Sequence, residues 1–295
     1  MPTNERRSAL NLAFSSSIFI CSKRERSNCF DIRPNKRYGQ NFLIDYNIVQ
    51  KITDSAGLTS SDRVLEIGPG IGTLTREMSK KAGSGVAVEV DKKLIPVLDS
   101  TLSHCSNIKI VNQDIFKYNV GDDFLDTVKV IGNLPYYITT PIVMWLLEEV
   151  PQAAEIVIMM QKEVAKRFAA KQGSRDSSAV TLAVQYYGQI EELFDVSKHC
   201  FYPAPKVDST VVRLKRHTKN PVAVKSEKLL FECIKKSFEK RRKTLINSLF
   251  GINGLEKERL VKILNEAGID PRLRAENLTL QQYAVIANLI YDINN

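Results

Sequence analysis

The 295-residue sequence predicts an α/β fold, in which a doubly wound parallel sheet is followed by a small helical domain. From residue 62 onward, short apolar runs that suit buried strands alternate with segments that suit helices. This alternation is typical of βαβ units, whose strands are covered on both faces. After about residue 217 the pattern becomes wholly helical. No apolar run approaches the roughly 20 residues that span a bilayer, so we expect a soluble protein.

The elements follow in a regular order. The expected strands are residues 63–67, 85–90, 107–111, 128–132, 155–160 and 209–214. The expected helices lie near residues 73–82, 92–103, 139–149, 161–171, 178–188, 226–250, 255–267 and 279–291. We therefore assign residues 34–216 to the sheet domain and residues 217–295 to the helical domain. Residues 1–33, which are rich in Ser, Arg and Asn, are expected to form a disordered extension.

The cysteines and histidines show no metal-binding pattern. The five cysteines are Cys21, Cys29, Cys105, Cys200 and Cys233, and they form no C-x-x-C pair. We expect them to be reduced thiols of a cytoplasmic protein. The three histidines are scattered and have no partner at ligand spacing. The sequence therefore predicts no metal site.

A glycine-rich loop in the stretch VLEIGPGIGTLT follows the first expected strand. Its glycines are Gly68, Gly70 and Gly72. They allow a sharp turn and a close approach of the backbone to a ligand. The dinucleotide pattern G-x-G-x-x-G would need another glycine at Thr73, so it is incomplete. Glu66 places an anion where a pyrophosphate would lie, which favours a ligand that carries positive charge.

Two further acidic residues lie at the ends of the next two expected strands. Glu89 closes the second strand and can accept hydrogen bonds from both hydroxyls of a ribose. Asp114 ends the third strand and can accept from an adenine amino group. A single acid at such a position caps the following helix more often than not. Three acids at successive strand ends, together with the glycine loop, favour S-adenosylmethionine as the cofactor.

The stretch GNLPYYITTP follows the fourth expected strand and suits an aromatic amine as the substrate. The Asn133 side-chain oxygen and the Leu134 carbonyl can accept the two hydrogens of such an amine and direct its lone pair at a methyl group. Pro135 fixes the turn. Tyr136 offers a face on which an extruded base can stack. A strand that merely ends in a proline turn explains neither Asn133 nor Tyr136.

The positive charge of the chain is concentrated in residues 206–243. This segment holds thirteen lysines and arginines and four acidic residues, a net charge of +9 that equals the charge of the whole chain. Concentrated positive charge is typical of proteins that bind a nucleic-acid backbone, although a solvated helix face explains a single cluster equally well. The residues from which we expect RNA contacts are Lys206, Lys240, Arg241, Arg242 and Lys243.

Over roughly residues 34–291, the sequence resembles the KsgA/RsmA family of small-subunit rRNA adenine N6,N6-dimethyltransferases. The motifs are NKRYGQNFLID, VLEIGPGIGTLT, AVEVDKKL, NQDIF, NLPYYITTP, MMQKEVAKR and FYPAPKVDSTVVRL. The resemblance implies a Rossmann-like class I methyltransferase domain and dimethylation of two adjacent adenines in a hairpin loop near the 3′ end of 16S rRNA. It also implies that Asn41, Leu43, Gly68, Glu89, Asp114 and Asn133 line the S-adenosylmethionine site. Phe201 is expected to flank the target base opposite Tyr136.

The sequence departs from this family at two positions, and two other functions compete. Tyr38 stands where Phe is common, and Tyr137 stands where Asn is frequent. One alternative is an Erm-type methyltransferase of large-subunit rRNA, which shares the cofactor motifs. The other is a non-enzymatic nucleic-acid binder of similar fold, as among mitochondrial transcription factors. The intact cofactor motifs disfavour the second alternative. We expect a cytoplasmic monomer that acts on the small ribosomal subunit or its precursor.

Overall fold

The computed structural model describes residues 12–14, 17–21 and 29–294 and divides the chain into two compact units. The sheet unit comprises residues 1–162 and 192–213, and the helical unit comprises residues 163–191 and 214–295. The helical unit includes residues 163–191 and 214–216, which the expected division assigns to the sheet domain; the domain boundary at residue 217 stays a prediction.

Most of the extension expected over residues 1–33 lies outside the described residues, so its disorder stays a prediction. Its described parts pair as an antiparallel sheet in the order β1-β2-β3. These strands are Leu12–Phe14, Ser17–Cys21 and Cys29–Ile32.

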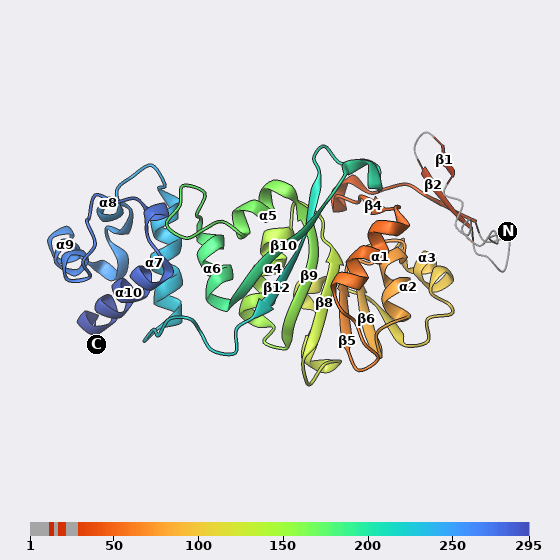
Figure 1. The fold of residues 1–295 in the computed structure, drawn as a ribbon, viewed down its shortest axis with the longest axis horizontal. Helices are drawn as coiled ribbons and strands as arrows, with labels where there is room; N and C mark the ends of the chain where they lie inside the picture. Colours follow the sequence, from red (N-terminus) through yellow and green to blue (C-terminus); the bar gives the residue numbers. More distant parts are fainter. Residues whose placement is uncertain (1–11, 15–16, 22–28, 295) are drawn as a thin grey trace. The chain divides into compact units, whose positions relative to one another are not determined.

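Seven strands form the main sheet in the order β10-β12-β9-β8-β5-β6-β7 (Figure 1). Their bounds are β5 Arg63–Ile67, β6 Ser84–Glu89, β7 Ile108–Asn112, β8 Val128–Asn133, β9 Ala153–Gln161, β10 Gly188–Val196 and β12 Ser209–Arg216. Strand β5 pairs in parallel with both β6 and β8, and the parallel pairing continues to β7 on one side and β9 on the other. The strand order reverses beside β5. In open α/β sheets, ligands bind at the carboxyl ends of the strands beside such a reversal.

Among its described residues, the sheet unit contains four α-helices. They are α1 Tyr46–Ser55, α2 Thr73–Ser79, α3 Ile95–Thr101 and α4 Thr139–Glu149. Helices α2, α3 and α4 contact β6, β7 and β9, respectively. Because helices cover these strands, all residues of β5 and β6 after the first in each are buried. Helix α1 was not expected from the sequence; the Asp45 side chain starts it by accepting from the backbone N–H of Asn47 at 2.9 Å.

A short antiparallel ladder fixes the segment that precedes α1. Strand β4 (Phe42–Leu43) pairs with β11 (Phe201–Tyr202), so that Leu43 lies opposite Phe201. Just beyond it, the Ile44 N–H donates to the Cys200 carbonyl at 2.9 Å. The ladder joins residues that are far apart in the sequence. It holds residues 35–43, which we call the N-terminal segment, beside the cavity at the carboxyl ends of the sheet strands.

The helical unit contains six helices among its described residues. They are α5 Lys162–Phe168, which starts at the unit boundary, α6 Ala179–Tyr187, α7 Glu227–Glu239, α8 Leu245–Leu249, α9 Lys257–Glu266 and α10 Leu280–Asn294. Helix α7 contacts α6, α8 and α10 and so lies at the centre of the unit.

The single helix expected near residues 226–250 is broken into α7 and α8, so this prediction was wrong. The break contains no glycine or proline. Instead, the N–H groups of Leu245 and Ile246 donate to the carbonyls of Leu273 and Pro271, at 2.6 and 3.2 Å. These tertiary hydrogen bonds replace the helical ones. The break leaves four consecutive basic residues in a loop.

Strand β10 was also missed from the sequence. It lies at an edge of the sheet and carries polar residues such as Gln189, Glu191 and Glu192. Edge strands are often polar, because an apolar edge would pair with other chains. The apolar run that indicates a buried strand is therefore missing here. Among the described residues, no helix is long and apolar enough to cross a membrane.

Candidate active site

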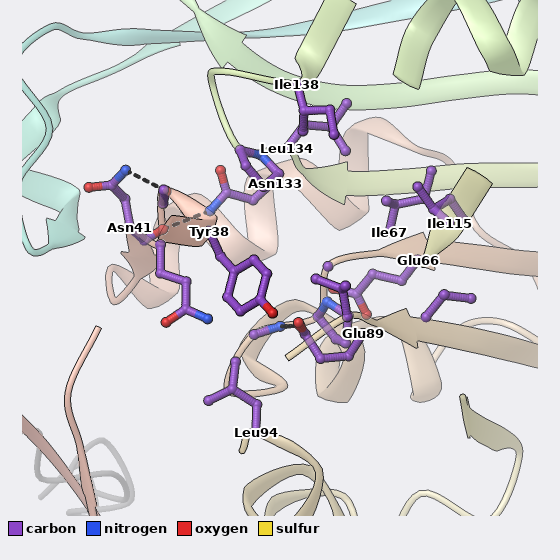
Figure 2. A pocket seen from close by; sticks show the side chains of 18 of the residues that line it. Tyr38, Asn41, Glu66, Ile67, Glu89, Leu94, Ile115, Asn133, Leu134 and Ile138 are labelled. Carbon is purple, nitrogen blue, oxygen red and sulfur yellow. Dashed lines mark hydrogen bonds between the residues drawn. The ribbon is translucent and has the colours of Figure 1, made fainter. Parts of the chain in front are cut away.

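A cavity of about 480 Å³ opens at the carboxyl ends of β5, β6 and β8 (Figure 2). Pockets of this size hold small-molecule ligands. The residues that line it include Asn41, Leu43, Gly68, Glu89, Asp114, Asn133, Leu134, Pro135 and Tyr136. The structure thus brings together every residue expected to bind the cofactor, and every expected catalytic residue except Phe201.

The glycine loop after β5 lines the cavity with Gly68 and Gly70. Gly68 has φ +70°, and a Cβ atom on it would meet no atom within 4 Å, so the backbone there faces open space. Gly70 has φ +60°, and a Cβ atom would lie 3.1 Å from the Phe42 ring. Both positions need glycine for their backbone conformation. At Gly68, the missing side chain also leaves room for a ligand beside the backbone.

Glu89 is held by the backbone at the end of β6. Its Oε2 accepts from the Gly70 N–H at 3.1 Å, and its Oε1 accepts from the Asp91 N–H at 2.9 Å. The side chain is buried, and this burial raises its pKa. Because a carboxylate oxygen can accept more than one hydrogen bond, both oxygens keep capacity for a ligand. The arrangement suits two adjacent hydroxyl groups.

Glu66 is the most deeply buried acid of the cavity, with 2% of its surface exposed. Its Oε2 is buried and has no hydrogen-bond partner among the described residues. Burial raises the pKa of this carboxyl group to about 8, and the neighbouring Glu89 charge raises it as well. A group in this state is neutral unless a cation compensates it. The cavity therefore favours a ligand with a positive group near Glu66.

Asp114 lies at the end of β7 and serves two purposes. Its Oδ1 accepts from the Phe116 N–H at 3.1 Å, so it caps the short 3₁₀ helix Ile115–Lys117 as an ordinary N-cap does. The residue also lines the cavity and is only half-buried. Its second carboxylate oxygen can accept from an exocyclic amine of a ligand.

Asn133, the last residue of β8, has its amide orientation set by the N-terminal segment. Its Nδ2 donates to the Asn41 carbonyl at 3.0 Å, and the Asn41 Nδ2 in turn donates to the Gly39 carbonyl at 3.1 Å (Figure 2). The donor end of the Asn133 amide is thereby occupied within the protein. Its oxygen is left to accept a hydrogen bond from a ligand, as expected from the sequence.

The two residues after Asn133 form a rigid turn into α4. Leu134 is buried, and its N–H donates to the Met159 carbonyl at 3.3 Å. The Pro135 carbonyl accepts from the Thr139 hydroxyl at 3.0 Å and from the Ile138 N–H at 3.1 Å. The turn is fixed by these bonds and by the proline ring.

Two tyrosines differ in how the protein holds them. The Tyr136 hydroxyl is hydrogen-bonded to the buried Ser209 hydroxyl at 2.7 Å, and burial raises the Tyr136 pKa. The Tyr137 ring is 61% exposed and lies beside Gly39. Both rings line the cavity. Tyr136 is therefore fixed at its polar end, whereas Tyr137 forms an exposed part of the cavity wall.

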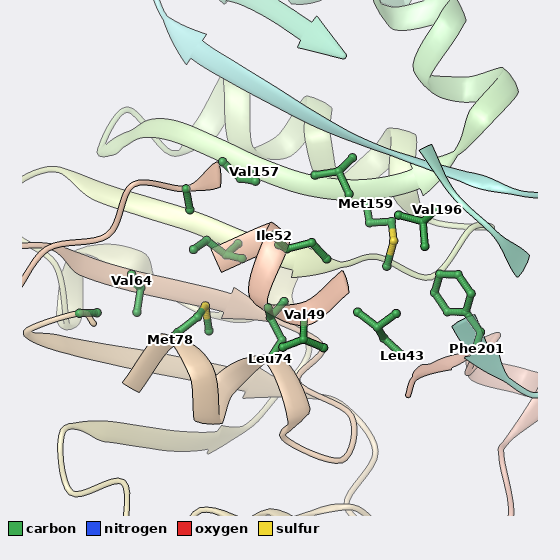
Figure 3. Close-up of a cluster of buried hydrophobic side chains, with 14 residues drawn as sticks. Leu43, Val49, Ile52, Val64, Leu74, Met78, Val157, Met159, Val196 and Phe201 are labelled. Carbon is green, nitrogen blue, oxygen red and sulfur yellow. The ribbon is translucent and has the colours of Figure 1, made fainter. Parts of the chain in front are cut away.

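Phe201 lies in the hydrophobic core of the sheet unit (Figure 3). It is 3% exposed, packs with Leu43 and Met159, and is not among the residues that line the cavity. The structure therefore does not bring Phe201 to the position expected of a residue that flanks the substrate. That role stays a prediction.

The chain matches a known family over most of its length. A family model described as ribosomal RNA adenine dimethylase matches residues 32–292. A protein of Clostridioides difficile (strain 630), named ribosomal RNA small subunit methyltransferase A, is 47% identical over 266 residues, which cover 88% of this chain and 92% of the relative. A protein of the same name from Bacillus mycoides (strain KBAB4) is 44% identical over 264 residues, 86% of this chain and 90% of the relative.

This chain belongs to the ribosomal RNA adenine dimethylase family. Solved structures show a similar fold. The crystal structure of the 23S rRNA methyltransferase ErmE has a TM-score of 0.66 and 27% identity, and the match covers 85% of this chain and 100% of that chain. A dimethyladenosine transferase from Plasmodium falciparum shares the fold, with a TM-score of 0.72, 23% identity, and coverage of 86% of this chain and 97% of that chain. The fold class is thus that of class I methyltransferases, as expected.

The basic residues expected to bind RNA in this family member lie in two loops. Lys206 is exposed in the loop between β11 and β12 of the sheet unit. Lys240, Arg241, Arg242 and Lys243 are exposed in the break between α7 and α8 of the helical unit. A small cleft of about 320 Å³ adjoins this break and is lined by Arg175, Asp176, Arg241, Arg242, Arg274 and Glu276.

Arg241 differs from its neighbours because it is bonded within the protein. Its guanidinium donates to the carbonyls of Arg175 and Ser177, at 2.6 and 3.0 Å. These carbonyls belong to the loop that precedes α6. Arg241 thus holds two loops of the helical unit together, a structural task that its position in a basic run does not indicate.

Several other cations of residues 206–243 are also engaged internally. Arg213 forms an ion pair with Glu155 at 3.0 Å, and Lys225 forms one with Asp292. Arg216 lies over the Tyr187 ring, 5.8 Å from its centre. The net charge of +9 in this segment therefore overstates the charge that is available to a partner.

Sequence reasoning missed three residues that support the site: Gln40, Asp91 and Ser209. Each is a common polar residue that acts by bonding to another residue far away in the chain. The only local signal was that all three residues fall inside motifs already noted. Among the described residues, no group of three or more His, Cys, Asp or Glu side chains could hold a metal ion.

Proposed function

We propose that this protein uses S-adenosylmethionine to dimethylate the N6 amines of two adjacent adenines in a hairpin loop near the 3′ end of 16S rRNA. The observation that carries the proposal is the Asn133 amide, whose donor end is held by the Asn41 carbonyl while its oxygen is left for the substrate. Membership of the ribosomal RNA adenine dimethylase family and the small-subunit names of its relatives support the choice of substrate. We place the reaction in the cytoplasm, on the small subunit or its precursor, and propose that the enzyme is a monomer.

The residues of the cavity fit S-adenosylmethionine. Glu66, with its unpartnered buried oxygen, would compensate the positive part of the cofactor. The two oxygens of Glu89 would accept the ribose hydroxyls, and Asp114 would accept from the adenine amine. The space beside Gly68 admits the ligand close to the backbone. When bound, the cofactor supplies a methyl group on a positively charged sulfur.

The turn after β8 would hold the target amine. The Asn133 oxygen and the Leu134 carbonyl can each accept one hydrogen of the amine. This draws the nitrogen lone pair out of the ring and directs it toward the methyl donor. Tyr136, fixed by Ser209, would stack on the extruded base, an interaction worth about 1–3 kcal/mol.

The site contributes orientation rather than proton transfer. The amine becomes acidic once it is methylated, so its proton can pass to water without a base on the enzyme. Catalysis then rests on holding the two reactants in line and on hydrogen bonds that strengthen in the transition state. After the first transfer one hydrogen remains for one of the two acceptors, so a second transfer can follow.

Mass spectrometry of rRNA nucleosides tests the proposal. Unmethylated small-subunit particles are incubated with the enzyme and S-adenosylmethionine, with large-subunit particles as the matched control. We expect N6,N6-dimethyladenosine in the small-subunit rRNA alone. Methylation of the large-subunit rRNA instead would support the Erm-type alternative, which the similarity to ErmE keeps relevant. Cofactor binding without any methylation would support the non-enzymatic alternative.

A further inference from the structure

Gln40 closes the turn that begins the N-terminal segment over the cavity. The Gln40 Oε1 accepts from the Asn35 N–H at 2.7 Å, and the Gln40 N–H donates to the Asn35 carbonyl at 3.4 Å. Gly39, inside the turn, has φ +57°. The side chain of Gln40 therefore completes a ring of hydrogen bonds that fixes the shape of the turn.

The other end of the same side chain reaches the cofactor side of the cavity. The Gln40 Nε2 donates to Asp91 Oδ2 at 2.9 Å. Asp91 is 5% exposed, and its Oδ1 accepts from the Lys93 N–H at 3.1 Å. Its own N–H donates to Glu89 Oε1. Gln40 thus ties the N-terminal segment to the residues that hold the Glu89 carboxylate.

The residue after Gln40 is bonded to the catalytic amide. The Asn41 carbonyl accepts from Asn133 Nδ2 at 3.0 Å. A shift of Gln40 would move this carbonyl, and the Asn133 amide would then lose the bond that sets its orientation. Figure 2 shows Asn41 and Asn133 on one side of the cavity and Glu89 on another, with Tyr38 of the segment projecting between them.

We infer that Gln40 is a positioning residue that couples the cofactor carboxylate Glu89 to the catalytic amide of Asn133 through the N-terminal segment. Each amide atom of Gln40 has a different partner, a backbone donor on one side and a buried carboxylate on the other. Only a side chain with an acceptor and a donor at this length satisfies both. Gln40 is not among the residues proposed above to touch the cofactor or substrate. The effect of Gln40 on turnover can be measured only if the proposed function is correct.

Exchanging the amide and the carboxylate between positions 40 and 91 tests the inference. Gln40→Glu keeps the acceptor for Asn35 but sets a carboxylate against Asp91, so we expect turnover to fall about tenfold to hundredfold. The affinity for S-adenosylhomocysteine, measured by calorimetry, should fall as well, because Asp91 is displaced. Asp91→Asn alone should lower turnover and affinity less. The Gln40 amide can rotate so that its oxygen faces the new amide at position 91, although Gln40 then loses its bond to Asn35.

The double variant Gln40→Glu with Asp91→Asn restores the pair with donor and acceptor exchanged. The amide introduced at position 91 can donate to the carboxylate introduced at position 40, while the amide oxygen still accepts from the Lys93 N–H. We expect turnover and S-adenosylhomocysteine affinity to recover to within about threefold of the wild type. Gln50→Glu, on the exposed face of α1, is the matched control for an added negative charge, and it should leave both values unchanged.

Two outcomes would overturn the inference. One is wild-type turnover and affinity in Gln40→Glu, and the other is a double variant no better than the product of its single variants. If Gln40→Glu does not fold, Gln40→Met removes both bonds at similar length and should show the same losses. Calorimetry measures the S-adenosylhomocysteine affinity of the single and double variants without rRNA. A failure of the proposed reaction in the wild-type enzyme therefore remains distinguishable from a failure of this inference.

Discussion

The cavity of the sheet unit and the basic loop of the helical unit are built on opposite principles. In the cavity, Glu89 and Asn133 are already hydrogen-bonded to the backbone before any ligand binds, whereas the buried Glu66 Oε2 has no partner among the described residues. In the loop between α7 and α8, the charged side chains are exposed, and Arg241 alone among residues 240–243 has a side-chain hydrogen bond within the described structure. Side chains whose orientation is fixed before the ligand binds suit a chemical reaction, whereas exposed charged side chains suit attraction to a flexible polyanion.

The comparison predicts that the largest effect comes from the cavity. Asn133→Ala removes the acceptor that we propose acts mainly in the transition state, so we expect turnover to fall by about a hundredfold or more. The affinity for rRNA should change little, because we expect the exposed basic residues, rather than Asn133, to provide most of the rRNA binding. Single-turnover methylation and filter binding measure the two quantities. Tyr136→Phe keeps the stacking ring and should remain active; equal losses in both variants would contradict the assignment.

A smaller loss is expected for cofactor binding. Glu89→Ala removes the proposed acceptor for the ribose hydroxyls and releases the Gly70 and Asp91 N–H groups. The lost hydrogen bonds to a charged group are worth about 1.5–3 kcal/mol, or roughly tenfold to more than a hundredfold in affinity. Calorimetric titration with S-adenosylhomocysteine measures this loss of affinity. Unchanged affinity would show that the ribose lies elsewhere in the cavity.

Adjacent arginines provide a matched pair for the basic loop. Arg242→Ala should weaken rRNA binding and reduce the slope of log affinity against log salt by roughly 0.7–0.9 per lost phosphate contact, with stability unchanged. Arg241→Ala should instead lower the free energy of unfolding by about 1–3 kcal/mol, because it leaves the Arg175 and Ser177 carbonyls without their donor. Salt titration and urea denaturation distinguish the two. An equal loss of stability in the two variants would contradict the view that Arg241 has a structural role that Arg242 lacks.

The last expected effect is in the pH dependence of stability, where the change is spread over several pH units. The Glu66 pKa is about 8 in the folded protein and about 4.5 in the unfolded chain, so the folded form binds this proton more tightly. The stability from Glu66 is therefore complete below about pH 4.5 and is lost as the pH rises through 8. Glu89, whose pKa is also raised, contributes in the same direction. Glu66→Gln should show a shallower loss of unfolding free energy between about pH 5.5 and 8, and an unchanged slope would contradict the buried, protonated state.

The sequence was a good guide where the information was local. The strands 63–67 and 128–133 are apolar runs buried on both faces, and their ends carry acids, glycines and the Asn133 turn in fixed order. The sequence was a poor guide where tertiary contacts decide. The bond between Gln40 and Asp91 spans 51 positions, the break after α7 depends on carbonyls of residues 271 and 273, and the polar edge strand β10 carries no apolar signal. For Phe201, the resemblance implied a place at the substrate, whereas packing against Leu43 buries its ring.

The ladder between β4 and β11 has a consequence for the order of events during synthesis. Asn41 and Leu43 line the cavity. Strand β4, which contains Leu43, is held in place by pairing with residues 201–202, more than 150 positions later in the chain. Contacts between such distant positions form late, because a long loop must close first. A growing chain that has completed β5 to β8 thus possesses the glycine loop and the three strand-end acids Glu66, Glu89 and Asp114, but strand β4 beside the cavity is not yet paired with β11. Full cofactor affinity should arise only after residue 202 has left the ribosome, so the nascent enzyme stays inactive until most of its length exists.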